Sequence, residues 1–433
     1  MASLLRFGRR ALGTKVPSLP QRNFTRLFAR LFARFYHGDF STFQEGDRVI
    51  IHGNKKPILT KPLRHGERTD LSRGYLEHSA IIGRRPWDPV QAYKGREHRI
   101  SHPTLEEYIH LTPRQVTPIY AADANLIVSL LDLHTSAPSP DDPNPPKLEI
   151  LEAGTGHGSL TLHLARAINA ANPHPPSIPA ASQVRVVKNA SIRPLSEDEG
   201  KLSKEVNTAP SEDPVQRQWD EWRARRGAVI HTVDASHKFS AHAEKIVRGF
   251  RRGIYAGNVD FHVGLVEDWI ADQLDQRRSK SSEGSLNTVE PFLSHVILDM
   301  PSAHQRIPHV APVLRRDGIL AVFMPSVTQI GDCVQLIRQQ RLPFVMDRVV
   351  ELGMGISSGR FWDVRMAVKK SRADPSTWTR DTDSEASDEE ESQSESAESE
   401  SENDDSVLVC RPKVGLKVAG GGFVGFWRRI EDR

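Results

Sequence analysis

The sequence predicts an α/β protein with a doubly wound, Rossmann-like sheet, a small N-terminal β domain and disordered insertions. A strand, a glycine-rich turn and an amphipathic helix follow one another between residues 148 and 168. Strand-like and helical segments then alternate up to residue 326, with an Asp-Gly turn expected at 317–318 before the last strand. This alternation is typical of a parallel sheet covered by helices. The chain of 433 residues exceeds the usual size of one domain, so more than one folded unit is expected.

Composition excludes several classes of protein. The chain is 38% hydrophobic and 26% charged, which suits a globular protein with a sizeable core. No apolar run approaches the roughly 20 residues of a membrane-spanning helix, so no membrane partner is expected. Cys333 and Cys410 are the two cysteines, too few for a disulfide scaffold or a CxxC metal site. The 18 histidines are scattered, so no metal is implied.

The N-terminal segment is strongly basic. Residues 1–38 hold eight Lys and Arg residues and no acid, and four of the arginines recur every four residues from Arg22 to Arg34. Aromatic and leucine residues occupy the other face of this predicted helix, as in a mitochondrial transit peptide. We therefore expect residues 1–38 to direct the protein to the mitochondrial matrix, with the nucleus as the alternative compartment. A basic arm that binds RNA or membranes is the competing interpretation.

Two further segments lack the pattern of a folded core. Residues 381–405 hold thirteen acids and no base, so residues 371–406 are predicted to form an acidic disordered loop. The strand-like segments after it predict that residues 407–433 complete the sheet of the main domain. Residues 171–226, rich in proline and mixed charge, are predicted to be an insertion within that domain, which spans 111–370. The small β domain is expected at 39–110.

The glycine-rich turn is the strongest local signal for a ligand. The segment 148–153 (LEILEA) predicts a buried strand, and Gly154, Gly156 and Gly158 follow it in a GxGxG turn. Dinucleotide-binding folds use GxGxxG instead. Glu152, two residues before the first glycine, suits a cationic ligand better than a diphosphate. A turn that binds nothing is the simpler alternative.

Acidic residues end the later strands. Asp234 ends the strand predicted at 228–234, where an acid can accept hydrogen bonds from ribose hydroxyls, and an ordinary strand-end acid is nearly as probable. Glu267 or Asp268 follows the third strand and is a candidate for the amino group of adenine. Asp299 ends the apolar strand that begins at residue 294, at the sheet edge where ligands bind in this fold class.

Taken together, the motifs resemble those of one family. These motifs are GDRVII (46–51), HSAIIGR (78–84), PRQVTPIYAAD (113–123), LEAGTGHGSLT (151–161), LDMPSA (298–303), MPSVTQI (324–330) and the terminal GGGFVGF. They resemble the catalytic subunit of the tRNA (adenine(58)-N(1))-methyltransferases, which are class I enzymes that use S-adenosylmethionine (AdoMet). The resemblance runs from about Gly46 to Ile430. The chain departs from the family pattern at Thr117, Leu265, Ala303, His304, Gly420 and Gly421.

The resemblance implies an activity and a set of site residues. The chain is expected to transfer a methyl group from AdoMet to N1 of adenine 58 in the tRNA T-loop, with Asp299 as the catalytic residue. The expected cofactor-binding residues are Glu152, Gly154, Gly156, Gly158, Ser159, Leu160, Asp234, Glu267, Asp299 and Tyr120. Tyr120 could equally be a core aromatic residue.

The resemblance also implies two kinds of partner. Candidates for phosphate contacts with tRNA are Lys55, Lys56, Arg84, Arg85 and Arg114, although solvated surface charges explain them equally well. Family members form tetramers, either homotetramers or heterotetramers with a non-catalytic subunit, and the sequence does not decide between these. The main rival function is that of the non-catalytic tRNA-binding subunit. A methyltransferase with another substrate and a nicotinamide-dependent dehydrogenase are further alternatives.

Overall fold

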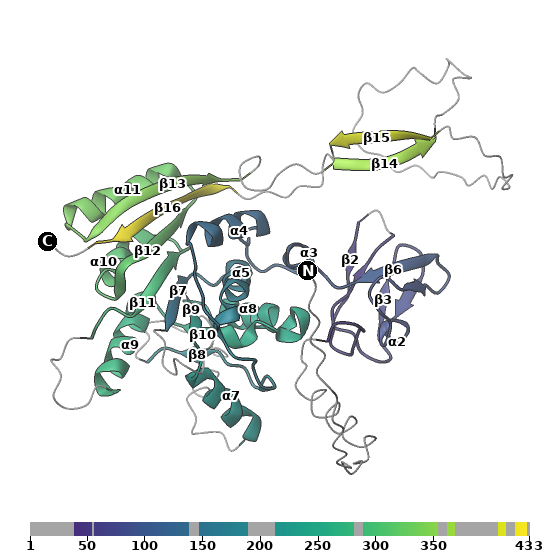
Figure 1. Cartoon of the computed structure of the whole chain (residues 1–433), viewed down its shortest axis with the longest axis horizontal. Coiled ribbons are helices and arrows are strands. Elements are labelled where there is room, and N and C mark those ends of the chain that lie inside the picture. Colours follow the sequence, from purple (N-terminus) through teal and green to yellow (C-terminus); the bar gives the residue numbers. More distant parts are fainter. Residues whose placement is uncertain are drawn as a thin grey trace, which may run out of the picture.

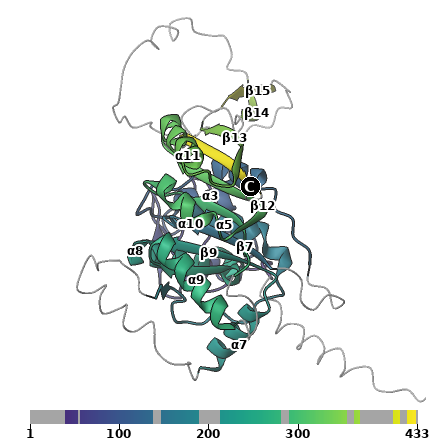
Figure 2. The same ribbon diagram turned by 90° about the vertical axis from the view of Figure 1, so that its left-hand side faces the viewer.

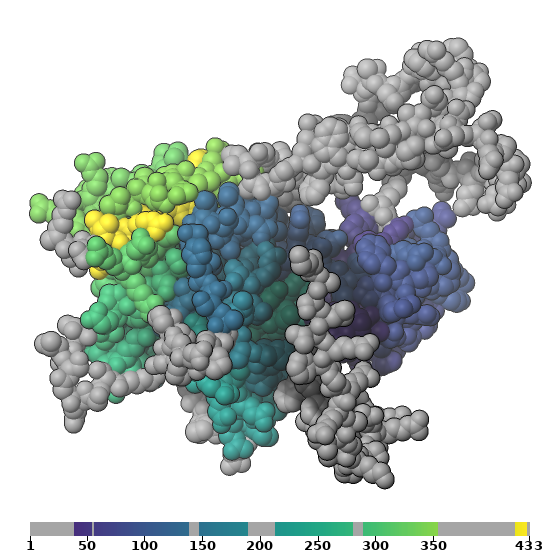
Figure 3. Space-filling model, in the orientation of Figure 1, coloured from purple at the N-terminus to yellow at the C-terminus, as the bar shows by residue number. Residues whose placement is uncertain are grey.

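The computed structural model describes residues 39–53, 56–137, 147–188, 213–280, 289–353, 362–368, 406–412 and 421–430. The expected transit peptide (1–38) and residues 371–405 of the expected acidic loop lie outside the described residues. Two folded lobes are visible in Figure 3, a smaller one formed by the N-terminal residues and a larger one formed by the rest.

The smaller lobe is a β domain. Its four-stranded sheet has the order β2-β1-β6-β5, and a separate hairpin pairs β3 with β4. The elements are β1 (Ile50–Ile51), β2 (Ile58–Leu59), β3 (Arg68–Asp70), β4 (Tyr75–Glu77), α2 (His78–Ile81), β5 (Pro89–Gln91) and β6 (Glu97–Ser101). Phe43, Val49, Leu63 and Leu76 belong to its buried core. The predicted N-terminal β domain is thus confirmed.

The larger lobe contains an eight-stranded sheet of order β13-β16-β12-β11-β7-β9-β10-β8 (Figure 1). Its strands are β7 (Leu148–Ala153), β8 (Arg185–Val186), β9 (Ala228–Asp234), β10 (Val259–Val263), β11 (Leu293–Leu298), β12 (Leu314–Met324), β13 (Phe344–Leu352) and β16 (Gly422–Arg429). All pairs are parallel except those of β16, which runs antiparallel between β12 and β13. The chain proceeds outward from β7 first through β9 and β10 and later through β11 and β12, so the strand order reverses at β7.

Helices cover both faces of this sheet. One core joins the sheet to α3 (Leu105–Leu111), α4 (Ala121–Leu130), α5 (Ser159–Ala167) and α8 (His237–Gly249). The other core joins it to α9 (Val266–Lys280), α10 (Ile307–Val310) and α11 (Val327–Gln339). Short 3-10 helices lie at Asn169–Ala171, Arg251–Gly253, Ala256–Asn258 and Ala303–Arg306. This arrangement confirms the predicted doubly wound sheet.

Three expectations about the chain's organisation need correction. The stretch 171–226 is not low in order throughout, because β8 adds a parallel strand beside β10 and α7 (Pro214–Ala224) buries Trp219 and Trp222. Asp317–Gly318 lies within β12, at a shift in its register with β11, and does not form a turn before it.

The third correction concerns the C-terminal strands. Only β16 joins the main sheet, whereas β15 (Ser406–Pro412) pairs with β14 (Trp362–Val368) in a separate two-stranded ribbon, drawn apart from the main sheet in Figures 1 and 2. The prediction that residues 407–433 complete the sheet is therefore correct for β16 and wrong for 407–412. Local strand patterns reveal that a segment is extended, but not which strand it will pair with.

A buried ion pair joins the two lobes. The Arg252 guanidinium donates to both carboxylate oxygens of Asp47 at 2.7 Å and to the backbone carbonyls of Asp39 and Thr42. Nearby, the Tyr108 hydroxyl donates to the Ile246 carbonyl at 2.9 Å.

Among the described residues, no helix has the length and apolar composition needed to cross a bilayer.

Candidate active site

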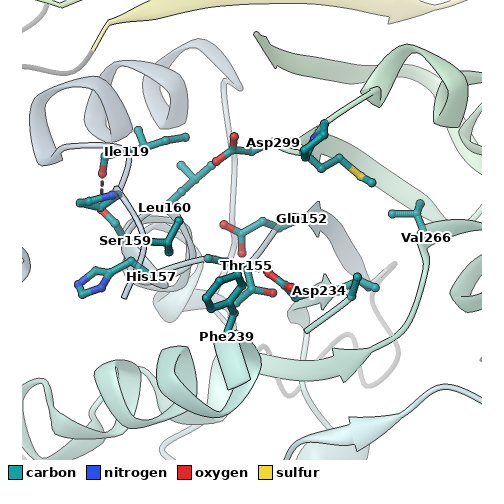
Figure 4. A pocket seen from close by; sticks show the side chains of 18 of the residues that line it. Ile119, Glu152, Thr155, His157, Ser159, Leu160, Asp234, Phe239, Val266 and Asp299 are labelled. Carbon is teal, nitrogen blue, oxygen red and sulfur yellow. Dashed lines mark hydrogen bonds between the residues drawn. The ribbon is translucent and has the colours of Figure 1, made fainter. Parts of the chain in front are cut away.

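The main pocket lies at the carboxyl edge of the sheet, where β7 is flanked by β9 and β11 (Figure 4). Its volume is about 390 Å³. Ligands bind in this position in open α/β sheets because the loops after the central strands diverge there to opposite faces. The walls come from residues 116–119, the turn after β7, the ends of β9 and β10, α8 and the segment after β11.

Gly154 is required by close backbone contact. Its φ is +93°, and a Cβ atom at this position would lie 1.8 Å from the carbonyl oxygen of Asp299. The Asp299 N–H in turn donates to the Ala153 carbonyl at 2.8 Å. The turn after β7 and the segment after β11 are therefore packed against one another, and both face the same pocket.

Glu152 is a buried carboxyl at the end of β7, with 1% of its surface exposed. It accepts a hydrogen bond from the Thr161 hydroxyl at 2.6 Å. Burial raises the pKa of Glu152 to about 8, against the hydrogen bonds from Thr161 and Thr232, and the charges of Asp299 and Asp234 raise it further. At neutral pH this group is therefore largely protonated until a cation compensates its charge.

Asp234 ends β9, as the sequence predicts. Its carboxylate accepts hydrogen bonds from the backbone N–H groups of Gly156 at 3.1 Å and Ser236 at 2.8 Å. Burial raises the pKa of Asp234, and these backbone hydrogen bonds partly offset that effect. The carboxylate is thereby held in place and retains acceptor capacity toward the pocket.

Asp299 follows β11 immediately and lines the opposite wall. Burial raises the pKa of Asp299 to about 7, and the charge of Asp234 contributes to the shift. Figure 4 shows the carboxyl groups of Glu152, Asp234 and Asp299 turned toward the same space. The sequence therefore brings three acids from three strands into one pocket.

Positive charge is scarce among the described residues of the pocket wall. His157 also lines the pocket, but burial, His242 and Arg114 lower its pKa to about 4, so the ring is neutral at physiological pH. Among the described residues, no group of three or more His, Cys, Asp or Glu side chains could hold a metal ion. Three acids without a countercharge, beside a glycine turn, fit an organic cation that also carries hydroxyl groups.

Most of the expected cofactor residues lie together in this pocket. Glu152, Gly154, Gly156, Ser159, Leu160, Asp234 and Asp299 all line it. Gly158, Tyr120 and Glu267 are not among the lining residues. A Cβ atom on Gly158 would lie 3.0 Å from the Ala243 Cβ, so this glycine allows α5 and α8 to pack closely. The Tyr120 hydroxyl accepts a hydrogen bond from Arg114 at 2.8 Å, and Glu267 forms an ion pair with Arg306 at 3.3 Å.

Several wall residues were missed as site residues by sequence reasoning. The segment 116–119 crosses the glycine turn, and Ser159 Oγ donates to the Ile119 carbonyl at 2.5 Å (Figure 4). Phe239 enters from the first turn of α8. The remaining additions are Thr155, His157, Val233, Ala235, Gly264, Leu265, Val266, Met300 and Pro301. The PRQVTPIYAAD motif was a usable signal for 116–119, whereas Phe239 gave none, because one aromatic residue at a helix start is ordinary core composition.

Comparison with known proteins agrees with this geometry. Residues 42–86 match the family model of the TrmI-like N-terminal domain. The chain is 26% identical over 300 residues to the tRNA (adenine(58)-N(1))-methyltransferase TrmI of Thermus thermophilus, which covers 69% of this chain and 81% of that protein. It is also 26% identical over 126 residues to the catalytic subunit of the tRNA (adenine(58)-N(1))-methyltransferase of Candida albicans, which covers 29% of this chain and 34% of that protein.

A solved structure agrees in fold. The AdoMet-dependent O-methyltransferase of Thermotoga maritima superposes with a TM-score of 0.52 and 14% identity, covering 91% of this chain and 96% of that one. The chain is thus similar to the TrmI methyltransferases in its N-terminal domain and along 69% of its length. The class I methyltransferase fold predicted from the sequence is thereby confirmed.

Two of the departures from the family pattern lie in the wall of the pocket. Thr117 and Leu265 both line it. Ala303 is completely buried, in the 3-10 helix that follows Asp299. Gly421 is exposed and immediately precedes β16, while Gly420 lies outside the described residues. The first two departures therefore change the pocket wall itself, and Ala303 changes the packing behind it.

Proposed function

We propose that this protein transfers a methyl group from AdoMet to N1 of adenine 58 in the T-loop of tRNA. One observation carries the proposal: Glu152, Asp234 and Asp299 face a single pocket at the strand-order reversal, formed around the Gly154 turn. The substrate in this proposal follows from the relatives that are named tRNA (adenine(58)-N(1))-methyltransferases.

The pocket residues fit AdoMet by their chemistry. Glu152 and the backbone of the turn at Gly154 and Gly156 would hold the cationic methionine end. Asp234 would accept hydrogen bonds from the ribose hydroxyls. Phe239, Leu265 and Val266 provide the apolar surface that an adenine ring requires.

When bound, AdoMet supplies an electrophilic methyl group. The task of the protein is to hold adenine N1 in line with that group. Because N1 lies on the Watson–Crick edge, the adenine must be unpaired or turned out of the RNA structure before it can react. Asp299 accepts a hydrogen bond from the adenine 6-amino group and stabilises the positive charge that develops on the ring during methylation.

The acidic pocket disfavours the non-catalytic alternative. A subunit that only binds tRNA gains nothing from three buried acids, since each costs free energy to desolvate. The GxGxG spacing disfavours a nicotinamide dinucleotide, because dinucleotide-binding folds use GxGxxG.

Methylation of defined transcripts tests the proposal. The purified protein is incubated with AdoMet and a tRNA transcript, and the product is mapped by mass spectrometry of nuclease fragments. We expect one N1-methyladenine at position 58 and none in a matched transcript with guanine there. Methylation at another position would contradict the assignment to adenine 58, and AdoMet binding without any methylation would support the non-catalytic alternative.

We further propose a tetramer, as the family resemblance implies. Its support is β13, the last strand of the main sheet in the described residues, where Val345 and Val349 are 52% and 39% exposed. An exposed apolar edge strand is a pairing surface for another chain. Light scattering after size-exclusion chromatography should give four times the chain mass of 48.5 kDa for a homotetramer. A stable monomer would contradict the homotetramer, and a tetramer that forms only with a second subunit would indicate the heterotetramer.

We also propose that residues 1–38 direct the protein to mitochondria. The support is the eight basic residues without an acid. A fusion of residues 1–38 to a fluorescent protein should enter mitochondria, and replacement of the four arginines from Arg22 to Arg34 by glutamine should abolish import. Nuclear accumulation of the full-length protein would favour the alternative compartment.

A further inference from the structure

The small β domain exposes a tryptophan beside a histidine. Trp87 is 59% exposed, and its ring stacks on His52 with a centroid distance of 4.8 Å and an interplanar angle of 18°. Its backbone is fixed on both sides, because its N–H donates to the Ile100 carbonyl and its carbonyl accepts from Arg99. The indole is thus held rigidly while more than half of its surface remains accessible.

A second stacked pair lies at the other end of the same hairpin. Tyr93 is 54% exposed and stacks on Tyr75 at 4.8 Å and 27°. The Arg68 guanidinium lies 4.6 Å from the centre of the Tyr75 ring, and the Lys94 ammonium lies 5.4 Å from that of Tyr93. Cations and aromatic faces therefore occur together.

The two exposed rings flank the short strand β5. Pro89 and Gln91 share one face of β5 because side chains alternate across a strand, whereas Trp87 lies in the turn before it, with φ +72°, and Tyr93 follows it. All four are at least partly exposed, whereas Val90 and Ala92 between them are buried. Trp87 and Tyr93 therefore lie at the two ends of an exposed strand face, six residues apart in the sequence.

The charge around these rings favours a polyanion. Residues 84–99 hold five basic residues (Arg84, Arg85, Lys94, Arg96, Arg99) and two acidic ones (Asp88, Glu97). Arg85 and Arg99 form long pairs of 3.8 and 3.9 Å with those acids, and Arg68 pairs with Asp70 at 3.4 Å. Exposed pairs of this kind contribute little free energy, so phosphates can compete for these arginines.

We propose that Trp87, Tyr93 and the exposed face of β5 between them form a stacking platform for unpaired bases of the RNA substrate. This inference rests on the proposed function, since it gives the tRNA a second contact outside the methylation pocket. Base–aromatic stacking is tolerant of sequence, and adjacent cations bind the phosphates. Interface cores between proteins also contain aromatic residues and arginine, so the excess of basic over acidic residues around the rings is the feature that favours RNA over a protein partner.

The experiment measures binding of a fluorescein-labelled tRNA transcript to the full-length protein by anisotropy, without AdoMet. Stacking energies correspond to a loss of about fivefold or more in affinity for each ring removed. We expect that loss for Trp87→Ala and for Tyr93→Ala, with partial rescue by Trp87→Phe. Lys94→Glu should reduce the salt dependence of binding. Val327→Ala, which shortens an exposed apolar side chain at the start of α11, serves as the matched control and should bind as the wild type does.

The outcomes separate this inference from the proposed function. Unchanged RNA affinity in a folded Trp87→Ala/Tyr93→Ala double variant overturns the platform, whatever the enzyme methylates. If the RNA affinity of the double variant is unchanged but its particle mass is smaller, the two rings belong to a protein interface. That result also overturns the stacking platform. If Trp87→Ala does not fold, Tyr93→Ala alone decides. Weakened RNA binding in the variants while the wild type methylates no adenine would support the platform and contradict the proposed function.

Discussion

The two ends of the central sheet handle buried carboxylates in opposite ways. At the amino end, Glu149 accepts hydrogen bonds from His231 at 3.1 Å and from Arg277 at 2.7 Å. Asp260 receives two bonds from Arg226, at 2.9 and 2.8 Å. Burial acts to raise the pKa of both carboxyls, but the neighbouring cations outweigh it, so both pKa values are lowered.

The carboxyl end has acids without such partners. Glu152 lies three residues after Glu149 on the same strand, yet burial raises its pKa to about 8. Burial likewise raises the pKa of Asp299 to about 7, and it also raises that of Asp234. Glu149 and Asp260 are paired with cationic side chains of the chain itself. The charge of the pocket acids would instead be balanced by a cationic ligand. The first cluster is therefore structural, and the second marks the ligand site.

The largest expected effect breaks the structural cluster. Asp260→Asn leaves the buried Arg226 guanidinium without a countercharge, and it leaves Arg223, which also pairs with Asp260 at 2.8 Å, with only the more exposed Asp220 at 3.4 Å. We expect a loss of about 3–5 kcal/mol in the free energy of unfolding. Urea denaturation measures it. The turnover of the protein that remains folded should match the wild type, and a stability equal to that of the wild type would contradict the structural assignment.

Asp299→Asn tests the pocket cluster, and here we expect turnover to change rather than stability. The change keeps the shape of the side chain and removes its charge, so kcat should fall by about 10²–10³. The Kd for AdoMet should rise by no more than about tenfold, because one charge interaction is lost. The midpoint of thermal unfolding should not fall, since burial already disfavours the ionised carboxylate. Asp275→Asn, at an exposed acid of α9, is the control. Full turnover of Asp299→Asn would eliminate Asp299 as the catalytic residue.

Glu152→Gln addresses cofactor affinity. We expect the Kd for AdoMet to rise about tenfold, which corresponds to 1.4 kcal/mol for one lost charge interaction. Because Glu152 is costly to ionise when buried, the free variant should be more stable than the wild type at pH 9. Calorimetric titration and urea denaturation give the two values. A variant that is less stable than the wild type but binds AdoMet with normal affinity would show that Glu152 has a structural role instead.

The smallest effect is a pH dependence. The folded pKa values of about 7 for Asp299 and about 8 for Glu152 exceed the ordinary values of 3.8 and 4.5. The free protein therefore binds extra protons and should lose stability as pH rises from about 4 to 8. A bound cation lowers both pKa values, so AdoMet affinity should increase by less than about tenfold from pH 7 to 8. Calorimetry in two buffers detects the released protons, and proton release unchanged in Asp299→Asn and Glu152→Gln would contradict this linkage.

Particular residues show how far sequence reasoning reached. The strands 148–153 and 228–234 have the predicted bounds because continuous apolar runs end at a glycine or an acid. Glu267 is expected in the site from the sequence but does not line the pocket, although Val266 beside it does. Adjacent side chains on a helix point about 100° apart. Val266 therefore faces the pocket, whereas Glu267, one residue later, forms the ion pair with Arg306.

The sequence by itself determined the glycine turn, the strand-end acids and the alternation that builds a doubly wound sheet, because these depend on local backbone preference and periodicity. Tertiary structure alone decided that β15 pairs with β14 and that β8 extends the sheet, since strand partners are chosen by contacts distant in the chain. It also decided which buried acids are neutralised. Glu149 and Glu152 are the same residue type on one strand, and only the arginine and histidine brought to one end by other elements separate an acid that stabilises the fold from one that can bind a ligand.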